Sequence, residues 1–208
     1  MVVRLVVVCT ANICRSPLAA AMLAAEVRAR GAAARVSVDS AGVHARHGDE
    51  AAGPSAAIAR DLGLDLEEHR SRPVDDDLDD ERTVLLTMTE QHRDLLVTAD
   101  ASLAARCFTL RELARLVGGI DPGGLPDAAD DRVLEVVRRA DAQRAPAPHA
   151  TARDATTRRA DARDATSTSA GPEDIADPYG RSDAHYQVMA TTVRELIDEL
   201  APVLLGAD

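Results

Sequence analysis

The sequence has no lysine and no tryptophan, only one phenylalanine and two tyrosines among 208 residues, so all 24 basic residues are arginine. Without lysine, a Walker-type nucleotide loop is excluded, because that loop needs a lysine for the phosphates. With about 1% aromatic residues, the core must be built from Leu, Val and Ala. A chain of this length that is 46% apolar can bury one good core, and we expect a single domain over residues 1–208.

Cysteine is also scarce. The three cysteines form no CxxC pair, and no two histidines stand at metal-ligand spacing, which excludes a disulfide framework and a zinc site. A reducing cytoplasm is therefore the expected location. The apolar start MVVRLVVV is too short to span a bilayer and lacks the charged start and cleavage site of a signal peptide. We interpret it as a buried strand and expect no membrane partner.

The sequence also has fewer basic than acidic residues, 24 against 35. The formal net charge is -11 and the isoelectric point is about 5.0. A general nucleic-acid binder needs a basic surface that displaces counterions from phosphates, so we expect no nucleic-acid partner. Any phosphate chemistry in this protein must be local.

Strand and helix patterns alternate along most of the chain. Residues 2–8 are Val and Leu broken only by Arg4, which is typical of a parallel strand covered on both faces. Alternation of this kind predicts a three-layer α/β fold, in which helices flank a four-stranded parallel sheet. We expect strands at 2–8, 35–42, 82–88 and 105–110, and helices at 17–31, 54–63, 89–97, 127–140 and 185–205.

One stretch interrupts the alternation. Residues 141–171 are mostly Ala, Arg, Asp, Thr, Ser and Pro, with hardly a large apolar residue and no helical or strand period. Such a composition cannot contribute to a core, so we expect a disordered surface insertion without a catalytic role.

The segment CTANICRS at 9–16 carries the strongest chemical signal. It places Cys9 and Arg15 between a buried strand and a helix start, where free N–H groups and the helix dipole favour a bound anion. The same field favours thiolate over thiol at Cys9. The planar guanidinium of Arg15 can hold two phosphate oxygens and stabilise the charge during transfer.

These residues resemble a known family. VCTANICRSP at 8–17 is similar to the signature loop of the low-molecular-weight protein tyrosine phosphatases, bacterial type, and DPYG at 177–180 is similar to their general-acid motif. SAG at 40–42 and LLTMTEQHRDLL at 85–96 resemble the family too, so the likeness covers about 2–140 and 172–205. It implies hydrolysis of phosphotyrosine in proteins, a phosphate-binding loop after the first strand, and no metal or other cofactor.

The resemblance implies a role for each matching residue. Cys9 would be the nucleophile that forms a cysteinyl-phosphate, Arg15 would bind phosphate, and Asp177 would act as general acid and then general base. Asp177 could instead be a simple turn residue before proline, and Asp174 is a rival acid. The substrate would be contacted by Thr10, Ala11, Asn12, Ile13, Cys14, Ser16 and Tyr179.

Other matching positions have supporting roles in the family. Asn12 would be tied to Ser40 and His69 in a network that holds the loop open, although His69 could be an ordinary surface residue. Ser16 would hydrogen-bond the thiolate. Cys14 would form a reversible disulfide with Cys9 under oxidation, unless it is only a small loop residue.

The residues around the loop also bear on the substrate. Related phosphatases that prefer phosphoarginine carry Thr where this chain has Ile13, so the resemblance favours phosphotyrosine. Tyr179 could form one wall of a deep slot for the substrate ring. The other wall has no Trp or Tyr, and His44 or His47 could serve. The expected partner is a phosphotyrosine-containing protein, with a tyrosine kinase as one candidate, and we expect a monomer.

Two other functions compete with this interpretation. A thiol-dependent arsenate reductase shares the fold and the loop but needs two further cysteines, whereas only Cys107 is left, in what looks like a buried strand. A phosphotyrosine-binding module without turnover is the second alternative. The presence of Cys9, Arg15 and Asp177 argues against it.

Overall fold

Four parallel strands form the centre of the molecule. The computed structural model describes residues 2–74, 80–144 and 171–206. Within these ranges the sheet has the strand order β2-β1-β3-β4, and every neighbouring pair is parallel. This confirms the predicted sheet. The strands are β1 (Val3–Cys9), β2 (Val36–Gly42), β3 (Thr83–Thr87) and β4 (Cys107–Thr109).

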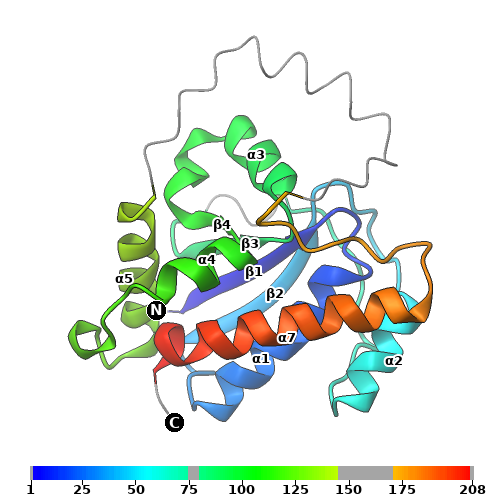
Figure 1. Ribbon diagram of the computed structural model, residues 1–208, viewed down its shortest axis with the longest axis horizontal. Coiled ribbons are helices and arrows are strands. Elements are labelled where there is room, and N and C mark those ends of the chain that lie inside the picture. Colours follow the sequence, from blue (N-terminus) through cyan, green and yellow to red (C-terminus); the bar gives the residue numbers. More distant parts are fainter. Residues whose placement is uncertain (1, 75–79, 145–170, 207–208) are drawn as a thin grey trace.

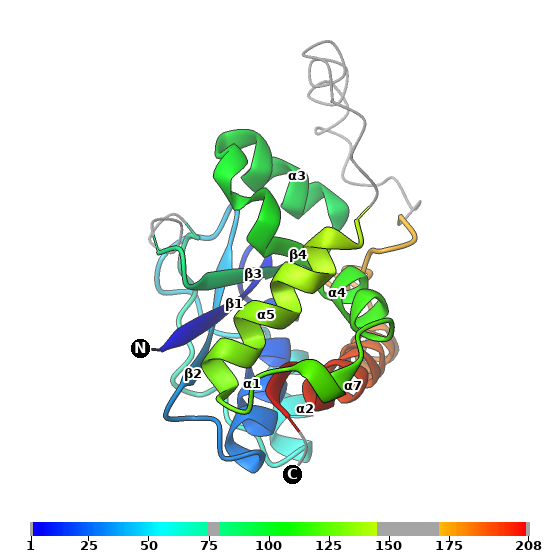
Figure 2. The same ribbon diagram turned by 90° about the vertical axis from the view of Figure 1, so that its left-hand side faces the viewer.

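Helices cover both faces of this sheet (Figures 1 and 2). One face packs against α1, α4, α5 and α7, and the other against α3 and a short 3-10 helix at Ala101–Arg106. The three-layer α/β architecture is therefore confirmed. The helices are α1 (Arg15–Ala29), α2 (Gly53–Asp61), α3 (Glu90–Ala99), α4 (Leu110–Val117), α5 (Ala129–Ala142) and α7 (Asp183–Leu205), with a second 3-10 turn at Pro122–Gly124.

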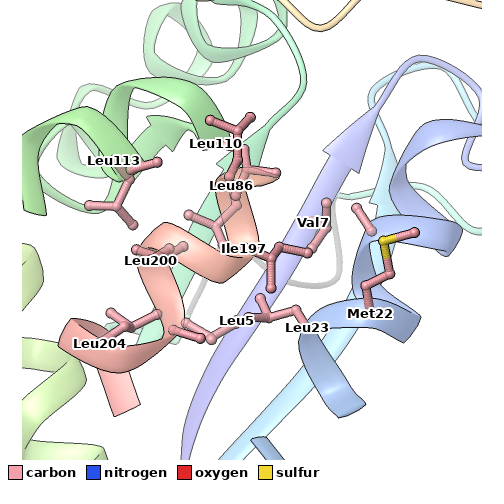
Figure 3. Packing of buried hydrophobic residues seen from close by; sticks show 14 of the residues in the cluster. Leu5, Val7, Met22, Leu23, Leu86, Leu110, Leu113, Ile197, Leu200 and Leu204 are labelled. Atoms are coloured by element: carbon pink, nitrogen blue, oxygen red, sulfur yellow. The ribbon is translucent and has the colours of Figure 1, made fainter. Parts of the chain in front are cut away.

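The alternating side chains of β1 divide the core into two parts. Leu5, Val7 and Cys9 face the larger helical layer, whereas Val6 and Val8 face the smaller one. Figure 3 shows side chains from β1, β3, α1, α4 and α7 meeting in the larger part. The alternation places Cys9 at the carboxyl end of a central strand, on the side of α1. This is the edge where open parallel sheets bind ligands.

The longest helix, α7, is amphipathic. Its buried residues Met189, Val193, Ile197, Leu200 and Leu204 recur at three- and four-residue spacing and pack on the larger core. Its exposed face carries charged residues. Across residues 2–74, 80–144 and 171–206, no helix combines the length and the apolarity that a membrane span requires.

The sequence prediction missed α4. It extended the fourth strand to Leu110, but the strand ends at Thr109 and a helix begins at Leu110. The helix starts there because Thr109 and Glu112 form a capping box: Thr109 Oγ1 accepts from the Glu112 N–H at 3.0 Å, and a Glu112 carboxylate oxygen accepts from the Thr109 N–H at 3.3 Å. The T-x-x-E pattern in TLRE could have indicated this start.

The predicted insertion, from about 141 to 171, overlaps a few residues that the structure describes at each end. Helix α5 continues to Ala142, and Arg144 is packed against the fold. Its Nη2 donates to the Cys107 carbonyl at 2.6 Å and to Glu112 at 3.0 Å, and its guanidinium carbon lies 3.6 Å from the centre of the Phe108 ring. At the other end, Gly171 is tied to Asp174. The remainder of the predicted insertion, 145–170, lies outside the described residues.

The packing of Arg144 predicts that this residue makes a measurable contribution to the free energy of unfolding. Arg144→Ala should lower the free energy of unfolding by about 2 kcal/mol, because it removes charge-assisted hydrogen bonds and a cation–π contact at a half-buried site. Arg138→Ala, in the last turns of α5, is the matched control: within the described residues Arg138 pairs with Glu135 at the surface, and its loss should cost less than about 0.5 kcal/mol. Urea unfolding followed by circular dichroism measures both. Equal losses would contradict a packing role for Arg144.

Candidate active site

The loop after β1 is held against the end of β2. The Val43 N–H donates to the Cys9 carbonyl at 3.0 Å, and the His44 N–H donates to the Thr10 carbonyl at 2.8 Å. Gly42 allows this approach, since a Cβ there would lie 2.6 Å from the Thr10 carbonyl oxygen and 2.9 Å from the Asn12 nitrogen. The glycine of the SAG motif is thus required by the closeness of the two backbones.

Asn12 is the anchor of the loop. It is fully buried and has a positive φ of 56°, a conformation that Asn tolerates better than most residues. Its Nδ2 donates to Ser40 Oγ at 2.8 Å and to Ser16 Oγ at 2.9 Å, and its Oδ1 accepts from the Arg72 N–H at 3.0 Å. The His69 Nε2–H donates to the Asn12 carbonyl at 2.7 Å. The structure therefore brings together Asn12, Ser40 and His69, as the resemblance implied.

Cys9 lies at the start of this loop beside a hydroxyl group. Its Sγ is 3.0 Å from Ser16 Oγ and is almost fully buried. The backbone N–H groups of residues 11–13 donate no hydrogen bond to any described part of the chain, and α1 begins just after them. These free donors and the positive end of the helix form a cradle for an anion next to the sulfur.

Arg15 connects this cradle to the distant acid segment. The residue is 3% exposed; its Nη1 donates to the Ile175 carbonyl at 3.1 Å, and its Nη2 lies 2.6 Å from Asp177 Oδ2 and 3.2 Å from Thr10 Oγ1. The Arg15 Nε is buried and has no hydrogen-bond partner within the described ranges. A buried donor left open at the rim of an anion cradle is suited to a phosphate oxygen.

The geometry distinguishes the two candidate acids. Asp177 is half-exposed, and one of its oxygens contacts Arg15 while the other accepts from the Tyr179 N–H at 3.1 Å. Both oxygens of Asp174 are instead occupied by the N–H groups of Glu90 at 2.8 Å and Gly171 at 2.9 Å. Asp174 therefore anchors the segment to α3, and Asp177 is the carboxylate at the cradle.

The two proposed walls of a substrate slot lie at the surface. Tyr179 is 67% exposed and follows Asp177 closely in the chain. His44 and His47 are both exposed, but only His44 is tied to the loop, through its N–H bond to the Thr10 carbonyl. The backbone of His44 is thus fixed beside the loop, and the residue opposite Tyr179 stays a prediction.

The other two cysteines are buried and protonated at neutral pH. Burial raises the pKa of Cys14 to about 11, against the lowering effect of the Tyr186 hydroxyl, whose oxygen lies 3.6 Å from the sulfur. Burial raises the pKa of Cys107 to about 12, and its place in β4 confirms the predicted buried strand. All three cysteines are free thiols, so the Cys9–Cys14 disulfide stays a prediction.

His92, on α3, was not recognised from the sequence. Its Nε2 lies 3.0 Å from Thr10 Oγ1, and the residue is 5% exposed. Burial, and then the charges of Arg15 and His44, lower the pKa of His92 to about 3. The imidazole is therefore neutral at pH 7. No local pattern could have identified this residue, since it is 82 positions from its partner.

These residues together define a class of site. A buried thiol, a cradle of N–H donors, a buried guanidinium and a carboxylate meet at one strand end, an arrangement that is suited to phosphoryl transfer. The parts of the chain that the structure describes contain no group of three His, Cys, Asp or Glu side chains placed to hold a metal ion. The class is a cysteine-dependent phosphatase built on a parallel α/β sheet.

Comparison with known proteins identifies the family. The family model for low molecular weight phosphotyrosine protein phosphatase matches residues 4–122, and the chain belongs to this family of phosphatases. A protein-arginine-phosphatase of Geobacillus stearothermophilus is 34% identical over 139 residues, 66% of this chain and 85% of the relative. The probable low molecular weight protein-tyrosine-phosphatase EpsP of Ralstonia nicotianae is 29% identical over 67% of this chain and 91% of its own length.

Solved structures agree with this assignment. The YwlE arginine phosphatase from Geobacillus stearothermophilus superimposes with a TM-score of 0.59 at 27% identity, covering 96% of this chain and 90% of that one. A low molecular weight protein tyrosine phosphatase from Bacillus subtilis shares the fold, with a TM-score of 0.63 at 24% identity and 97% and 96% coverage. The predicted family is confirmed, and its named relatives act on two kinds of phosphorylated residue.

The neutral state of His92 predicts a pH dependence of stability. Its pKa falls from 6.5 to about 3 on folding, so the unfolded chain binds the extra proton between these values. The free energy of unfolding should therefore decrease as the pH falls from 6.5 towards 3, by at most about 1.4 kcal/mol per pH unit from this residue.

Chemical denaturation of the wild type and of His92→Gln across pH 3 to 7 measures that contribution. Other groups, His69 included, titrate in both proteins, so only the difference in slope counts. We expect the glutamine variant to lose less stability on acidification. Parallel curves would show that His92 is not held neutral in the folded protein.

Proposed function

We propose that this protein hydrolyses phosphotyrosine in proteins through a cysteinyl-phosphate intermediate. The observation that carries the proposal is the position of Arg15. One buried guanidinium touches Asp177, lies within the loop that begins at Cys9, and keeps an unpartnered Nε. It can therefore bind the phosphate, and in the proposed complex the thiol and the carboxylate would stand on either side of the phosphorus.

In the first step the Cys9 thiolate attacks phosphorus, and the bond from phosphorus to the phenolic oxygen breaks. Asp177, in its protonated form, gives its proton to the departing phenolate. The N–H groups of residues 11–13 and the Arg15 guanidinium would stabilise the charge on the three equatorial oxygens. The side-chain oxygens of Asp177 are half-exposed, so a leaving group can reach them.

In the second step Asp177 accepts a proton from water, which attacks phosphorus and releases inorganic phosphate and the Cys9 thiolate. Ser16 would stabilise that thiolate. Its hydroxyl is 3.0 Å from the sulfur and 3.2 Å from the Ala41 carbonyl, so its single proton can turn from the carbonyl to the sulfur. Asn12 holds the serine oxygen in place for both partners.

Phosphotyrosine is the proposed substrate because of Ile13. This side chain is partly buried against the core at the loop. By the family resemblance, phosphatases that prefer phosphoarginine would carry Thr at this position. Tyr179, largely exposed, could stack on the substrate ring. Phosphoarginine is the second candidate, since the protein-arginine-phosphatase of Geobacillus stearothermophilus is 34% identical to this chain. The partner would be a phosphotyrosine protein in the cytoplasm, with a tyrosine kinase as one candidate.

The catalytic roles are tested by substitution. Cys9→Ser should abolish hydrolysis of p-nitrophenyl phosphate, and Asp177→Asn should lower kcat by about 100-fold to 10,000-fold. The loss of kcat in Asp177→Asn should be larger for phenyl phosphate than for p-nitrophenyl phosphate, because the more basic phenolate depends more on protonation as it leaves. Asp183→Asn, an exposed acid at the start of α7, is the matched control and should retain activity.

Steady-state kinetics measures these effects. A loss in Asp177→Asn that does not depend on the leaving group would contradict the general-acid role. Phosphate binding without wild-type turnover would leave the non-catalytic binding module. Arsenate-dependent oxidation of thioredoxin would instead support the reductase.

Substrate choice is tested by comparing peptides that carry phosphotyrosine or phosphoarginine at the same position. The wild type should have the larger kcat/KM for phosphotyrosine. Ile13→Thr should change the ratio of the two kcat/KM values by about tenfold in favour of phosphoarginine, since it replaces an apolar contact by a hydroxyl group that can hydrogen-bond. Ile13→Val keeps the apolar surface and should leave the ratio unchanged. A wild type that prefers phosphoarginine would establish the second candidate.

A further inference from the structure

The His92 ring is hydrogen-bonded to the loop through its Nε2. This nitrogen lies 3.0 Å from Thr10 Oγ1, whereas Nδ1 is buried without a hydrogen-bond partner in the described part of the chain. Helix α3 fixes the residue at its first turn, since the His92 N–H donates to the capping Thr89 hydroxyl at 3.2 Å. The imidazole is thus aimed at Thr10 by a rigid element.

The unpartnered nitrogen indicates which tautomer is present. A neutral imidazole carries one N–H and one lone pair. A proton on Nδ1 would leave a buried donor without an acceptor, and such donors are rarer in proteins than under-used acceptors. The proton is better placed on Nε2, where it makes the bond to Thr10 Oγ1. The low pKa of His92 agrees with a ring that stays neutral beside Arg15.

Thr10 then accepts two hydrogen bonds and keeps its own proton free. Its Oγ1 has two lone pairs, one taken by the His92 Nε2–H and the other by the Arg15 Nη2–H at 3.2 Å. The remaining O–H donates to neither group. Thr10 is in the loop, and the Arg15 nitrogen that it touches also contacts Asp177. An oxygen bound by that guanidinium would lie within reach of this hydroxyl.

We propose that Thr10 is a side-chain donor to the phosphoryl group, and that His92 is the positioning residue that aims its hydroxyl. The chain of bonds runs from His92 Nε2–H to Thr10 Oγ1, and from Thr10 O–H to an oxygen held by Arg15. It adds the neutral Thr10 hydroxyl, oriented by His92 of α3, to the backbone donors of the loop. This inference rests on the proposed phosphatase function.

Substitutions at the two residues test the relay. Thr10→Val removes the hydroxyl at nearly constant volume and should weaken binding of inorganic phosphate, and lower kcat/KM for p-nitrophenyl phosphate, by about tenfold to a hundredfold. Thr10→Ser keeps the hydroxyl and should stay within about threefold of the wild type. His92→Leu should match the loss in Thr10→Val, whereas His92→Gln, which keeps a donor at the Nε2 position, should restore most of it.

The double variant separates positioning from folding. If His92 acts through Thr10, adding His92→Leu to Thr10→Val should cause little further loss of phosphate affinity, because the relay is already broken. A second loss as large as the first would show that His92 supports the structure independently and would overturn the proposal. Thermal unfolding of each variant identifies any that fail to fold. If Thr10→Val or His92→Leu does not fold, Thr10→Ser and His92→Gln still test the relay, because each keeps a hydrogen-bond donor at its position.

Nitrogen-15 NMR of the histidine rings gives a readout that a structural role would not produce. We expect the His92 proton on Nε2, and a change in its resonance when inorganic phosphate is added. A proton on Nδ1 would overturn the relay. Calorimetry measures phosphate binding without turnover. A wild type that binds phosphate but has no activity would refute the phosphatase proposal. The Thr10 contact could still be tested in that case by the phosphate affinity of the variants.

Discussion

The hydrogen bonds of the Asn12 amide are the constraint on which the site depends. Asn12 is fully buried, and its side chain joins the loop to β2 through Ser40, to α1 through Ser16 and to the segment after α2 through Arg72. These bonds hold a residue with positive φ in place and point the neighbouring N–H groups into the cradle. A buried, fully used amide in such a network is strongly position-specific, because each lost bond leaves a partner unsatisfied.

In this strongly acidic protein, the groups that favour an anion are confined to one small place. The formal charge is -11, yet Arg15 is buried beside backbone donors and the start of α1. Electrostatic interactions are stronger where water is excluded, whereas the surface charges are screened. Asp177 balances Arg15 at 2.6 Å, which keeps a buried cation from being unpaired.

Most of the fold and the local part of the site could be predicted from the sequence. Val and Leu runs identified the strands, and the spacing of Cys9 and Arg15 identified the loop, since both depend on neighbouring residues. Helix α4 was missed, although its capping box is visible in TLRE. The predicted helix at 127–140 lies two residues before α5 at Ala129–Ala142. The packing of Arg144 against Glu112 and the Phe108 ring is tertiary, so no local pattern indicates it.

The contact between His92 and Thr10 could not be predicted, because the two residues are 82 positions apart and meet only when α3 packs beside the loop. The same holds for the choice between Asp174 and Asp177. Both are acids before the last helix, and only the backbone donors that occupy Asp174 show which one is left for chemistry. Long-range geometry of this kind leaves no periodic signal in the chain.

The three attachments of the acid segment have a consequence for the position of Asp177. Between Gly171 and Asp177 the chain is fastened by Asp174 to α3, by the Ile175 N–H to the Met88 carbonyl and by the Ile175 carbonyl to Arg15. The position of the Asp177 carboxylate is therefore fixed by contacts made after Gly171, within the segment itself and with the end of β3, α1 and α3.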